Sequence, residues 1–482
     1  MERVDPNKVL AKIHELVNEY RDKPDKAKLQ DAQKLCHDFL NHNPDSPAGL
    51  YFLGLIYGHM GCNGAAVSLL SRAVQIAPQT MEAWNNLGLC LRRVKQREGA
   101  IKALTKALQI KPNSPLILGN LAACYINEGV PGTALKLADE ALAARPTDDS
   151  ARWNKCLALL ELGRFKEAWE LHEVRLGGEI ENRIAIRNYH PDRKTPWWDG
   201  KRKELVVCHG EQGLGDEIMF ASCLPDAIAT GARVIVECAP RLEKTFRRSF
   251  PGAVIHGTHD VDGHEWTRVY GLPDSMTALG SLPRFFRNDL KDFPRKPFLK
   301  NDPMETEKIL ARLPSGKPLV GIAWEGGVHE TRYSERSVPL NFLHPLLMHD
   351  VTWVSVNYLA GSAQEAELLR SESGIKIHHH ADLVQAPADI DNLVNLVAGL
   401  DLVITVSQTV FHVCGALGIP CWILAPRKPD WRLGVRGSHL PWYGDEIRIF
   451  RQTGDHWHGL IERMSWELGR ALDRAAQNRE AA

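Results

Sequence analysis

A residue pattern that repeats every 34 positions constrains the fold of this sequence more than any other feature. Proline recurs at one place in successive repeats, at Pro44, Pro78, Pro112 and Pro146. Alanine keeps the same period at a second place, at Ala32, Ala66, Ala100, Ala134 and Ala168. Small residues at fixed sites let two helices cross closely, and proline does not continue a helix interior. Each repeat therefore predicts a pair of packed helices.

This period and pattern are typical of tetratricopeptide repeats, which stack into an all-helical solenoid. We expect four clear repeats from Pro47 to Leu176, preceded by a degenerate capping repeat, and we assign residues 1–180 to this domain. Such a solenoid has a concave surface, which usually binds a peptide or protein. The pattern therefore predicts a protein partner.

Three asparagines keep the same period, at Asn86, Asn120 and Asn154. Each lies two residues before the small position of its helix, an offset that we expect to place it on the concave side. An amide both donates and accepts hydrogen bonds, so a row of amides suits the backbone of an extended peptide. In this feature the repeats resemble those of O-GlcNAc transferase, where an asparagine ladder holds the acceptor polypeptide. The alternative is that asparagine is tolerated on a solvated helix face.

The sequence changes character after the repeats. Residues 181–203 are rich in charge and include Trp197 and Trp198, and we interpret them as a linker whose tryptophans pack against a neighbouring domain. Apolar strand candidates separated by helical stretches follow, which indicates an α/β fold. In the first set they are Leu205–Cys208, Arg233–Glu237 and Thr267–Tyr270.

A proline-rich break from Phe293 to Pro303 precedes a second set of strand candidates. We therefore expect two Rossmann-like halves, residues 204–300 and 301–482, facing each other across a cleft. The final helix, Trp457–Ala475, is expected to pack across their interface. The second set of strands is Leu319–Trp324, Val351–Val356, Ile375–His378, Leu402–Val406, Cys421–Leu424 and Ile447–Phe450.

The stretch from Leu402 to Leu424 predicts a strand, a tight turn, a helix and a second strand. In such a βαβ unit the turn lies at the carboxyl end of a strand, where open sheets bind ligands. The start of the following helix has unpaired N–H groups and favours phosphate. Ser407, Gln408 and Thr409 add donors at the turn, with His412 one turn further. The alternative is an ordinary turn capped by Ser407.

A second loop, CHGEQGLGDEIMF, follows the first strand of the first half. Gly213 and Gly215 allow a sharp turn there, as at a phosphate-binding loop, and Asp216 begins a helix. Either Asp216 or His209 could face the cleft as a general base. The alternative for Asp216 is a helix N-cap, a role that aspartate fills well.

Four segments of the α/β part together resemble the catalytic part of bacterial tetratricopeptide-containing glycosyltransferases. They are GEQGLGDEIMFASCLP, GIAWEGG, SERSVPLNFLHPLL and VSQTVFHVCGALGIPCWIL followed by PDWR. That family is related to lipopolysaccharide heptosyltransferases and, more distantly, to O-GlcNAc transferase. The resemblance implies the GT-B architecture of two Rossmann-like halves, with a nucleotide-sugar side in residues 301–482. It also implies sugar transfer with inversion, without metal, and with no cofactor beyond the nucleotide-sugar co-substrate.

The resemblance also assigns roles to residues. Asp216 matches the aspartate proposed as base in the heptosyltransferases, Arg336 matches a lysine that neutralises the donor phosphates, and His412 matches a histidine at the diphosphate-binding helix. The heptosyltransferases have Asp-Thr-Gly where this chain has Ser407-Gln408-Thr409, which leaves the donor's identity open. Further candidates for donor contacts are Arg332, Asp430, Trp431 and Arg432.

Composition narrows the class of protein. Lys and Arg together number 59, as do Asp and Glu, which argues against a general grip on nucleic acid. No apolar run is long enough to span a bilayer. The ten cysteines contain no C-x-x-C pair, as expected for reduced thiols in the cytoplasm. Adjacent histidines at 378–380 would alternate between the faces of a strand, so we expect no metal site there.

We therefore expect a cytoplasmic glycosyltransferase that moves a sugar to a hydroxyl of a protein acceptor held by the repeats. Flagellin is one acceptor implied by resemblance to repeat-bearing flagellin-modifying enzymes. Two alternatives stay open. The chain is a protein-binding scaffold with an inactive glycosyltransferase-like domain, or it transfers sugar to a lipid or polysaccharide.

Overall fold

The computed structural model describes residues 5–177, 194–211, 213–258, 266, 269–327, 333–385, 390–428, 430–454 and 456–480. The chain separates into two compact units, Met1–Leu159 and Leu160–Ala482. This division falls inside helix α9 (Asp149–Glu161), before the expected boundary at residue 180. The next helix, α10 (Phe165–His172), therefore belongs to the second unit, although the repeat pattern counts it as half of the fourth repeat.

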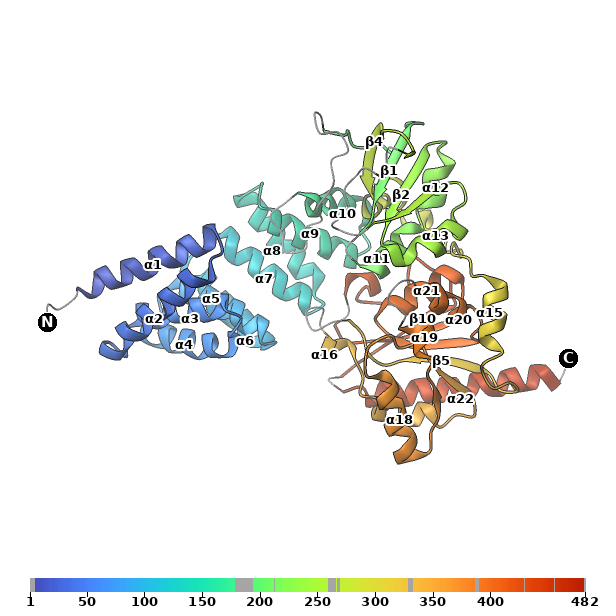
Figure 1. Ribbon diagram of the computed structural model, residues 1–482. Helices are drawn as coiled ribbons and strands as arrows, with labels where there is room; N and C mark the ends of the chain where they lie inside the picture. The colour runs from blue at the N-terminus through green and yellow to red at the C-terminus, as the bar shows by residue number, and fades with distance from the viewer. Residues whose placement is uncertain are drawn as a thin grey trace. The chain divides into compact units, whose positions relative to one another are not determined.

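The first unit consists of consecutive helix pairs (Figure 1). Carboxylate side chains of Asp5 and Asp25 accept backbone N–H groups at the first two helix starts, and the Ser46 hydroxyl does so at the third. The predicted repeats are confirmed, with a longer helix pair before them. The helices are α1 (Pro6–Asp22), α2 (Lys26–His42), α3 (Pro47–His59), α4 (Asn63–Ile76), α5 (Met81–Arg93), α6 (Arg97–Ile110), α7 (Pro115–Asn127) and α8 (Pro131–Ala144).

Small residues explain the spacing of these pairs. A Cβ atom placed on Gly88 of α5 would lie 2.6 Å from Leu104 Cγ of α6, so only glycine fits this crossing. Gly54 stands in the same relation to Leu70, at 2.7 Å. The repeated alanines, such as Ala100, are fully buried. The 34-residue period thus reflects close contacts that recur once per repeat.

The second unit contains two parallel sheets (Figure 1). The first has the order β3-β2-β1-β4. Its strands are β1 (Leu205–His209), β2 (Arg233–Cys238), β3 (Val254–Gly257) and β4 (Ser275–Ala278). The connecting elements are α11 (Leu214–Ala221), α12 (Leu224–Ala229), η2 (Pro240–Leu242), α13 (Glu243–Ser249), η4 (Leu279–Ser281), α14 (Pro283–Phe286) and η5 (Leu290–Asp292).

The predicted third strand of this half was wrong. Val269 and Tyr270 lie outside the sheet, and Thr267 and Arg268 lie outside the described residues. The fourth strand, β4, escaped prediction because Ser275 and Thr277 interrupt its apolar character, and β3 also escaped it. At the linker end, Trp198 is buried against Phe285 and Phe286, as expected. Trp197 forms an isolated bridge with β4, but its side chain is exposed, so the expected packing was wrong for this tryptophan.

The second sheet has six parallel strands in the order β10-β9-β8-β5-β6-β7. Counted from β5 along the chain, this is the 3-2-1-4-5-6 order of dinucleotide-binding Rossmann folds. The first sheet follows the start of the same order. All six predicted strands of this half are confirmed within a few residues, as β5 (Leu319–Ala323), β6 (Thr352–Ser355), β7 (Ile377–His378), β8 (Leu402–Val406), β9 (Cys421–Ala425) and β10 (Ile447–Arg451).

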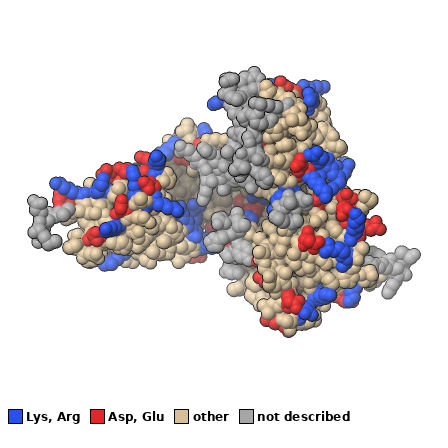
Figure 2. All heavy atoms as spheres, in the orientation of Figure 1, with Lys and Arg blue, Asp and Glu red and all other residues tan. Residues whose placement is uncertain are grey.

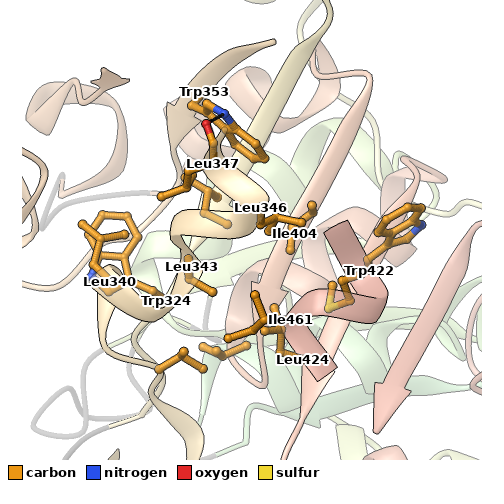
Figure 3. Packing of buried hydrophobic residues seen from close by; sticks show 14 of the residues in the cluster. Trp324, Leu340, Leu343, Leu346, Leu347, Trp353, Ile404, Trp422, Leu424 and Ile461 are labelled. Atoms are coloured by element: carbon orange, nitrogen blue, oxygen red, sulfur yellow. Dashed lines mark hydrogen bonds between the residues drawn. The ribbon is translucent and has the colours of Figure 1, made fainter. Parts of the chain in front are cut away.

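The second sheet is surrounded by helical elements, and its core is apolar (Figure 3). Trp324, Trp353 and Trp422 pack there with leucines from the segment after β5. The helices are α15 (Pro303–Leu310), α16 (Tyr333–Arg336), η7 (Leu340–Leu343), α17 (His344–Leu347), α18 (Ser362–Ser373), α19 (Ala381–Val384), α20 (Asp391–Ala398), α21 (Thr409–Leu417), η8 (Trp431–Leu433) and α22 (His458–Glu480).

The final helix, α22, packs into this core and not across the interface between the halves, so that expectation was wrong. Ile461 and Met464 are buried in the same cluster as Leu343 and Leu346. Apolar residues spaced along one face of α22 match the open face of the second sheet, which provides the larger apolar surface. Its helical character was predicted correctly.

The two halves are joined by polar contacts as well as by packed helices. Asp391 of α20 is fully buried and accepts hydrogen bonds from Thr245 Oγ1 at 2.8 Å and from Arg248 of α13. Lys244 Nζ lies 3.0 Å from the same carboxylate. Burial alone would raise the pKa of Asp391, but hydrogen bonds from these partners hold it below its usual value. This cluster fixes one side of the junction.

Acidic and basic side chains are mixed over the face of the molecule seen in Figure 2. In the described parts of the chain, no helix combines the length and apolar character needed to cross a bilayer.

Candidate functional site

The carboxyl edges of the two sheets meet at one place in the second unit. In each sheet the strand order reverses beside the first strand, at β1 and β4 and at β5 and β8. Such reversals are the usual ligand sites of open α/β sheets. The loops that leave β1 and β8 lead into α11 and α21, and these two helices pack against each other. This meeting point is the candidate site.

Asp216, in the first turn of α11, forms an ion pair with Arg432 of the other half. Arg432 Nε donates to Asp216 Oδ1 at 2.5 Å, and Nη2 donates to Oδ2 at 2.7 Å. The N-cap of α11 is Gly213, so the N-cap interpretation of Asp216 was wrong. Both paired side chains keep a quarter of their surface exposed. The candidate base and a candidate donor contact are therefore direct partners.

Asp430 continues this pair into a chain of charges. Its Oδ2 accepts from Arg336 Nη2 at 3.0 Å and from Ser407 Oγ at 3.3 Å, and its Oδ1 accepts from Arg432 N at 3.0 Å. Burial alone would raise the pKa of Asp430, but Arg336 and Arg432 outweigh it and hold the pKa low. Asp430 thus stays ionised and positions both arginines beside the start of α21.

Two residues of the site were missed from the sequence. Tyr358, just after β6, is hydrogen-bonded to Thr409, and its charged neighbours are Arg241 and Arg336. Arg241 belongs to η2 of the first half, and its buried Nε has no hydrogen-bond partner among the described residues. Each follows closely on a strand that was predicted. Inspection of the residues just past every predicted strand end would have found both.

His412 lies inside the junction of the helices. Its Nδ1 is 2.7 Å from Tyr443 Oη, and a Cβ atom on Gly215 would lie 2.9 Å from His412 Cδ2. Gly215 is therefore needed for α11 to approach α21. Burial lowers the pKa of His412 to about 3, so its imidazole is neutral near pH 7. Any role of His412 at a phosphate is that of a neutral group.

His209, the other candidate base, lies within the first sheet rather than in a cleft. Its Nδ1 is 2.6 Å from Glu237 Oε2, and Thr258 Oγ1 donates to Glu237 Oε1 at 2.8 Å. The His209 residue is 3% exposed. The expectation that it faces the cleft was wrong, because a short polar network at the strand ends holds it.

Of the remaining candidates for donor contacts, Gln408 lies at the start of α21 and Trp431 lies beside Arg432. Gln408 is the N-cap residue of α21, and its Nε2 lies 3.2 Å from Thr405 Oγ1. Trp431 supports Arg432, whose guanidinium lies 4.8 Å from the centre of the Trp431 ring. Arg332 lies outside the described residues.

The three ladder asparagines are bonded to the preceding repeat. Asn86 Nδ2 donates to Tyr51 Oη at 3.3 Å, and Asn120 Nδ2 donates to Asn85 Oδ1 at 2.8 Å. Asn154 is buried and its Nδ2 donates to the Gly119 carbonyl at 2.9 Å. The expectation of amides on an open surface was therefore wrong for Asn154. The 34-residue spacing of these asparagines is accounted for by contacts between neighbouring repeats.

Two of the histidines at 378–380 form hydrogen bonds. His379 Nδ1 bonds to Ser355 Oγ at 3.0 Å, and His380 Nδ1 to Arg312 Nη2 at 3.2 Å. Within the described residues, no group of three His, Cys, Asp or Glu side chains is arranged to hold a metal ion.

Comparison with known families identifies the repeats. The tetratricopeptide repeat pattern matches residues 82–114, which contain α6 and all of α5 except its first residue. The N-terminal helices form a tetratricopeptide-repeat solenoid. Repeat solenoids of this kind indicate protein or peptide binding.

A longer similarity extends beyond the repeats. Protein FlbA of Caulobacter vibrioides is 31% identical over 310 residues, which are 61% of this chain and 50% of that protein. The chain thus matches about half the length of this relative.

Solved structures similar to the chain match about a third of it. The MamA crystal structure is 21% identical over 32% of this chain and 89% of its own, with a TM-score of 0.30. The Thermus thermophilus protein TTC0263 is 20% identical over 35% of this chain and 88% of its own, with the same score. YrrB, described as a tetratricopeptide protein with an unusual peptide-binding site, is 17% identical over 35% of this chain and 82% of its own, also at 0.30.

Proposed function

We propose that the second unit is a GT-B-type, inverting, metal-independent glycosyltransferase that uses a nucleotide-sugar donor. The observation that carries this proposal is the meeting of two parallel sheets with Rossmann strand order, joined at their carboxyl edges by Asp216 and Arg432. Nucleotides bind at such edges. A site made from two of them would bind a donor on one half and an acceptor on the other.

The donor phosphates would bind at the start of α21. That helix is nine residues long and presents the unpaired N–H groups of its first turn. Tyr358 is hydrogen-bonded to Thr409 at this point, and its charged neighbours are Arg336 of the second half and Arg241 of the first. Two guanidinium groups and a helix start suit a diphosphate better than a neutral ligand. Because Ser407 and Gln408 differ from the heptosyltransferase residues at these positions, the identity of the nucleotide and of the sugar stays open.

The reaction assigns a task to each charged group. Asp216 would take the proton of the acceptor hydroxyl while the hydroxyl oxygen attacks the anomeric carbon of the donor sugar. The bond from that carbon to the phosphate oxygen would break, and the nucleotide would leave with the electron pair. Arg336 and Arg432 would stabilise the charge on the leaving phosphate. Attack opposite the leaving group inverts the anomeric centre.

In this scheme Asp216 has to leave Arg432 before it can act as a base, because a carboxylate held by two charge-assisted hydrogen bonds is a weak proton acceptor. A bound diphosphate would supply the competing anion for Arg432. Donor binding would thus release the base, and the two events are linked through one guanidinium.

The test combines binding with turnover. A panel of nucleotides and nucleotide sugars is screened by thermal shift, because a ligand bound only by the folded protein raises Tm. The best donor is then used to compare wild type, Asp216→Asn and a matched exposed change, Asp350→Asn. Turnover should fall at least about a hundredfold in Asp216→Asn alone. No shift with any member of the panel would contradict the proposal.

A second candidate function is a scaffold whose glycosyltransferase-like domain no longer turns over. The closed Asp216–Arg432 pair favours it, since the candidate base is already neutralised. The repeats would then be the working part, with a protein partner in either case. Donor binding without nucleotide release, when the genuine acceptor is present, would support the scaffold. The acceptor we favour is a protein, such as a flagellin, and transfer to a lipid or polysaccharide is tested in the same assay.

A further inference from the structure

The last segment of the repeat pattern, Phe165–Leu176, is built into the candidate site. We call it the bracing segment; it comprises α10 and the short η1 (Glu173–Leu176). Trp169 and Arg175 in this segment are 1% and 3% exposed, although a terminal repeat helix normally has one solvated face. Both side chains pack against the α/β part of the second unit, to which the segment itself belongs.

Arg175 connects this segment to the loop that carries Asp216. Its Nη2 donates to Glu211 Oε1 at 3.1 Å and to Ser281 Oγ at 3.3 Å, and its Nη1 donates to the His172 carbonyl at 3.0 Å. Glu211 lies in the same loop as Asp216, five residues earlier. The Gly280 N–H also donates to Glu211 Oε1, at 2.6 Å. Glu211 is thus held from two directions.

Gly280 packs so closely against Arg175 and Glu211 that a larger residue does not fit at this position. A Cβ atom on Gly280 would lie 2.5 Å from Glu211 Oε1 and 2.7 Å from Arg175 Nη2. Burial raises the pKa of Glu211, and Arg175 counteracts this shift. A buried ion pair is weak evidence for stability, because apolar residues of similar volume often replace one without loss. The pair needs a reason other than folding.

The same segment also reaches the loop that carries Arg432. The Trp169 ring lies 6.4 Å from the Trp431 ring and 6.1 Å from the Trp442 ring, between centres. The centre of the His172 ring lies 6.4 Å from the centre of the Trp431 ring. Trp169 Nε1 is fixed by the Arg287 carbonyl of the first half at 2.7 Å. Trp431 in turn supports the Arg432 guanidinium.

We propose that Arg175 is a positioning residue: through Glu211 it sets the loop that presents Asp216 to Arg432, while Trp169 sets the other side through Trp431. This role rests on the proposed function for its catalytic meaning. The last repeat helix then sets the geometry of the reacting groups without touching the substrate. Arg175 also bonds to Ser281 and to Glu173, and Glu211 is its contact in the loop that carries Asp216.

The test uses the full chain and the double variant Arg175→Met/Glu211→Leu, which removes both buried charges; Glu173, the other carboxylate beside Arg175, keeps its hydrogen bond from Ser281. A control is Arg312→Met/Asp382→Asn, an arginine–aspartate pair in the second half, whose Nη1–Oδ2 distance is 2.8 Å. Hydrogen exchange is measured over 205–222 and 430–434. The positioning role predicts at least a tenfold faster exchange in both regions for the first variant only.

Turnover supplies the second measurement. The first variant should lose at least tenfold in kcat while the KM for the donor stays within twofold, and the control should keep both. Unchanged exchange and wild-type kcat in a folded Arg175→Met/Glu211→Leu variant would overturn the proposal. An inactive wild type would refute the proposed function, whereas the exchange result would still decide whether Arg175 positions the Asp216 loop.

Discussion

Breaking the Asp216–Arg432 pair should change stability and activity together, and the size of the stability change follows from its geometry. The two hydrogen bonds are short and charge-assisted, and bonds to charged groups contribute about 1.5–3 kcal/mol each. Each side chain is a quarter exposed, so water offsets part of this. Arg432 also keeps Asp430 as a second carboxylate, 3.8 Å away. We therefore expect a coupling free energy of about 1.5–3 kcal/mol for the whole pair.

The assay is a double-mutant cycle with Asp216→Asn and Arg432→Gln, each measured by urea unfolding. Tryptophan fluorescence reports mainly on the second unit, because of 13 tryptophans only Trp84 and Trp153 lie in the first. Raising the salt concentration should weaken the coupling only partly, since the pair is partly shielded from solvent.

The exposed pair Arg370–Glu367 is the matched control, and its cycle should give no resolvable coupling. A coupling free energy below about 0.5 kcal/mol for Asp216 and Arg432 would refute the view that this pair joins the halves. Wild-type turnover in Asp216→Asn would separately remove Asp216 as the base.

Three further outcomes are expected. Arg336→Ala and Arg241→Ala should each weaken nucleotide binding by about 1.5–3 kcal/mol in calorimetry, and full affinity in both would place the phosphates elsewhere. Burial raises the pKa of Glu217 to about 8, so the folded state holds a proton that the unfolded state releases above about pH 4.5. The free energy of unfolding should therefore fall as pH rises from about 4.5 to 8; Glu217→Gln should flatten this slope in a urea series, and an unchanged slope would contradict it. Asn154→Ala should destabilise the repeats by about 0.5–1.5 kcal/mol, because the Gly119 carbonyl loses the hydrogen bond from the Asn154 amide; a calorimetric melt unchanged by this variant would show that the contact is dispensable.

Much of the architecture was accessible without coordinates. The strands of the second half are short apolar runs between helical stretches, so hydropathy located all six. In the first half hydropathy missed β4, because Ser275 and Thr277 are not apolar. Their backbone groups nevertheless pair with β1 as those of any other residue would. Candidate residues next to strand ends were also accessible, because parallel strands bring their carboxyl ends to one edge.

The repeats and the strand–turn–helix units were determined by the sequence itself, because local spacing decides them: a 34-residue period or an apolar run acts over neighbouring residues. Only the tertiary structure decided which charges meet. Asp216 and Arg432 are 216 residues apart in the chain, and no local pattern records a pair joined by the docking of two sheets. For the same reason Asn154, which bonds to the preceding repeat, is buried and does not lie on the open surface expected of it. Burial and partner choice depend on the whole fold: they place His209 in a buried contact with Glu237, and they make Arg241 a candidate ligand of phosphate.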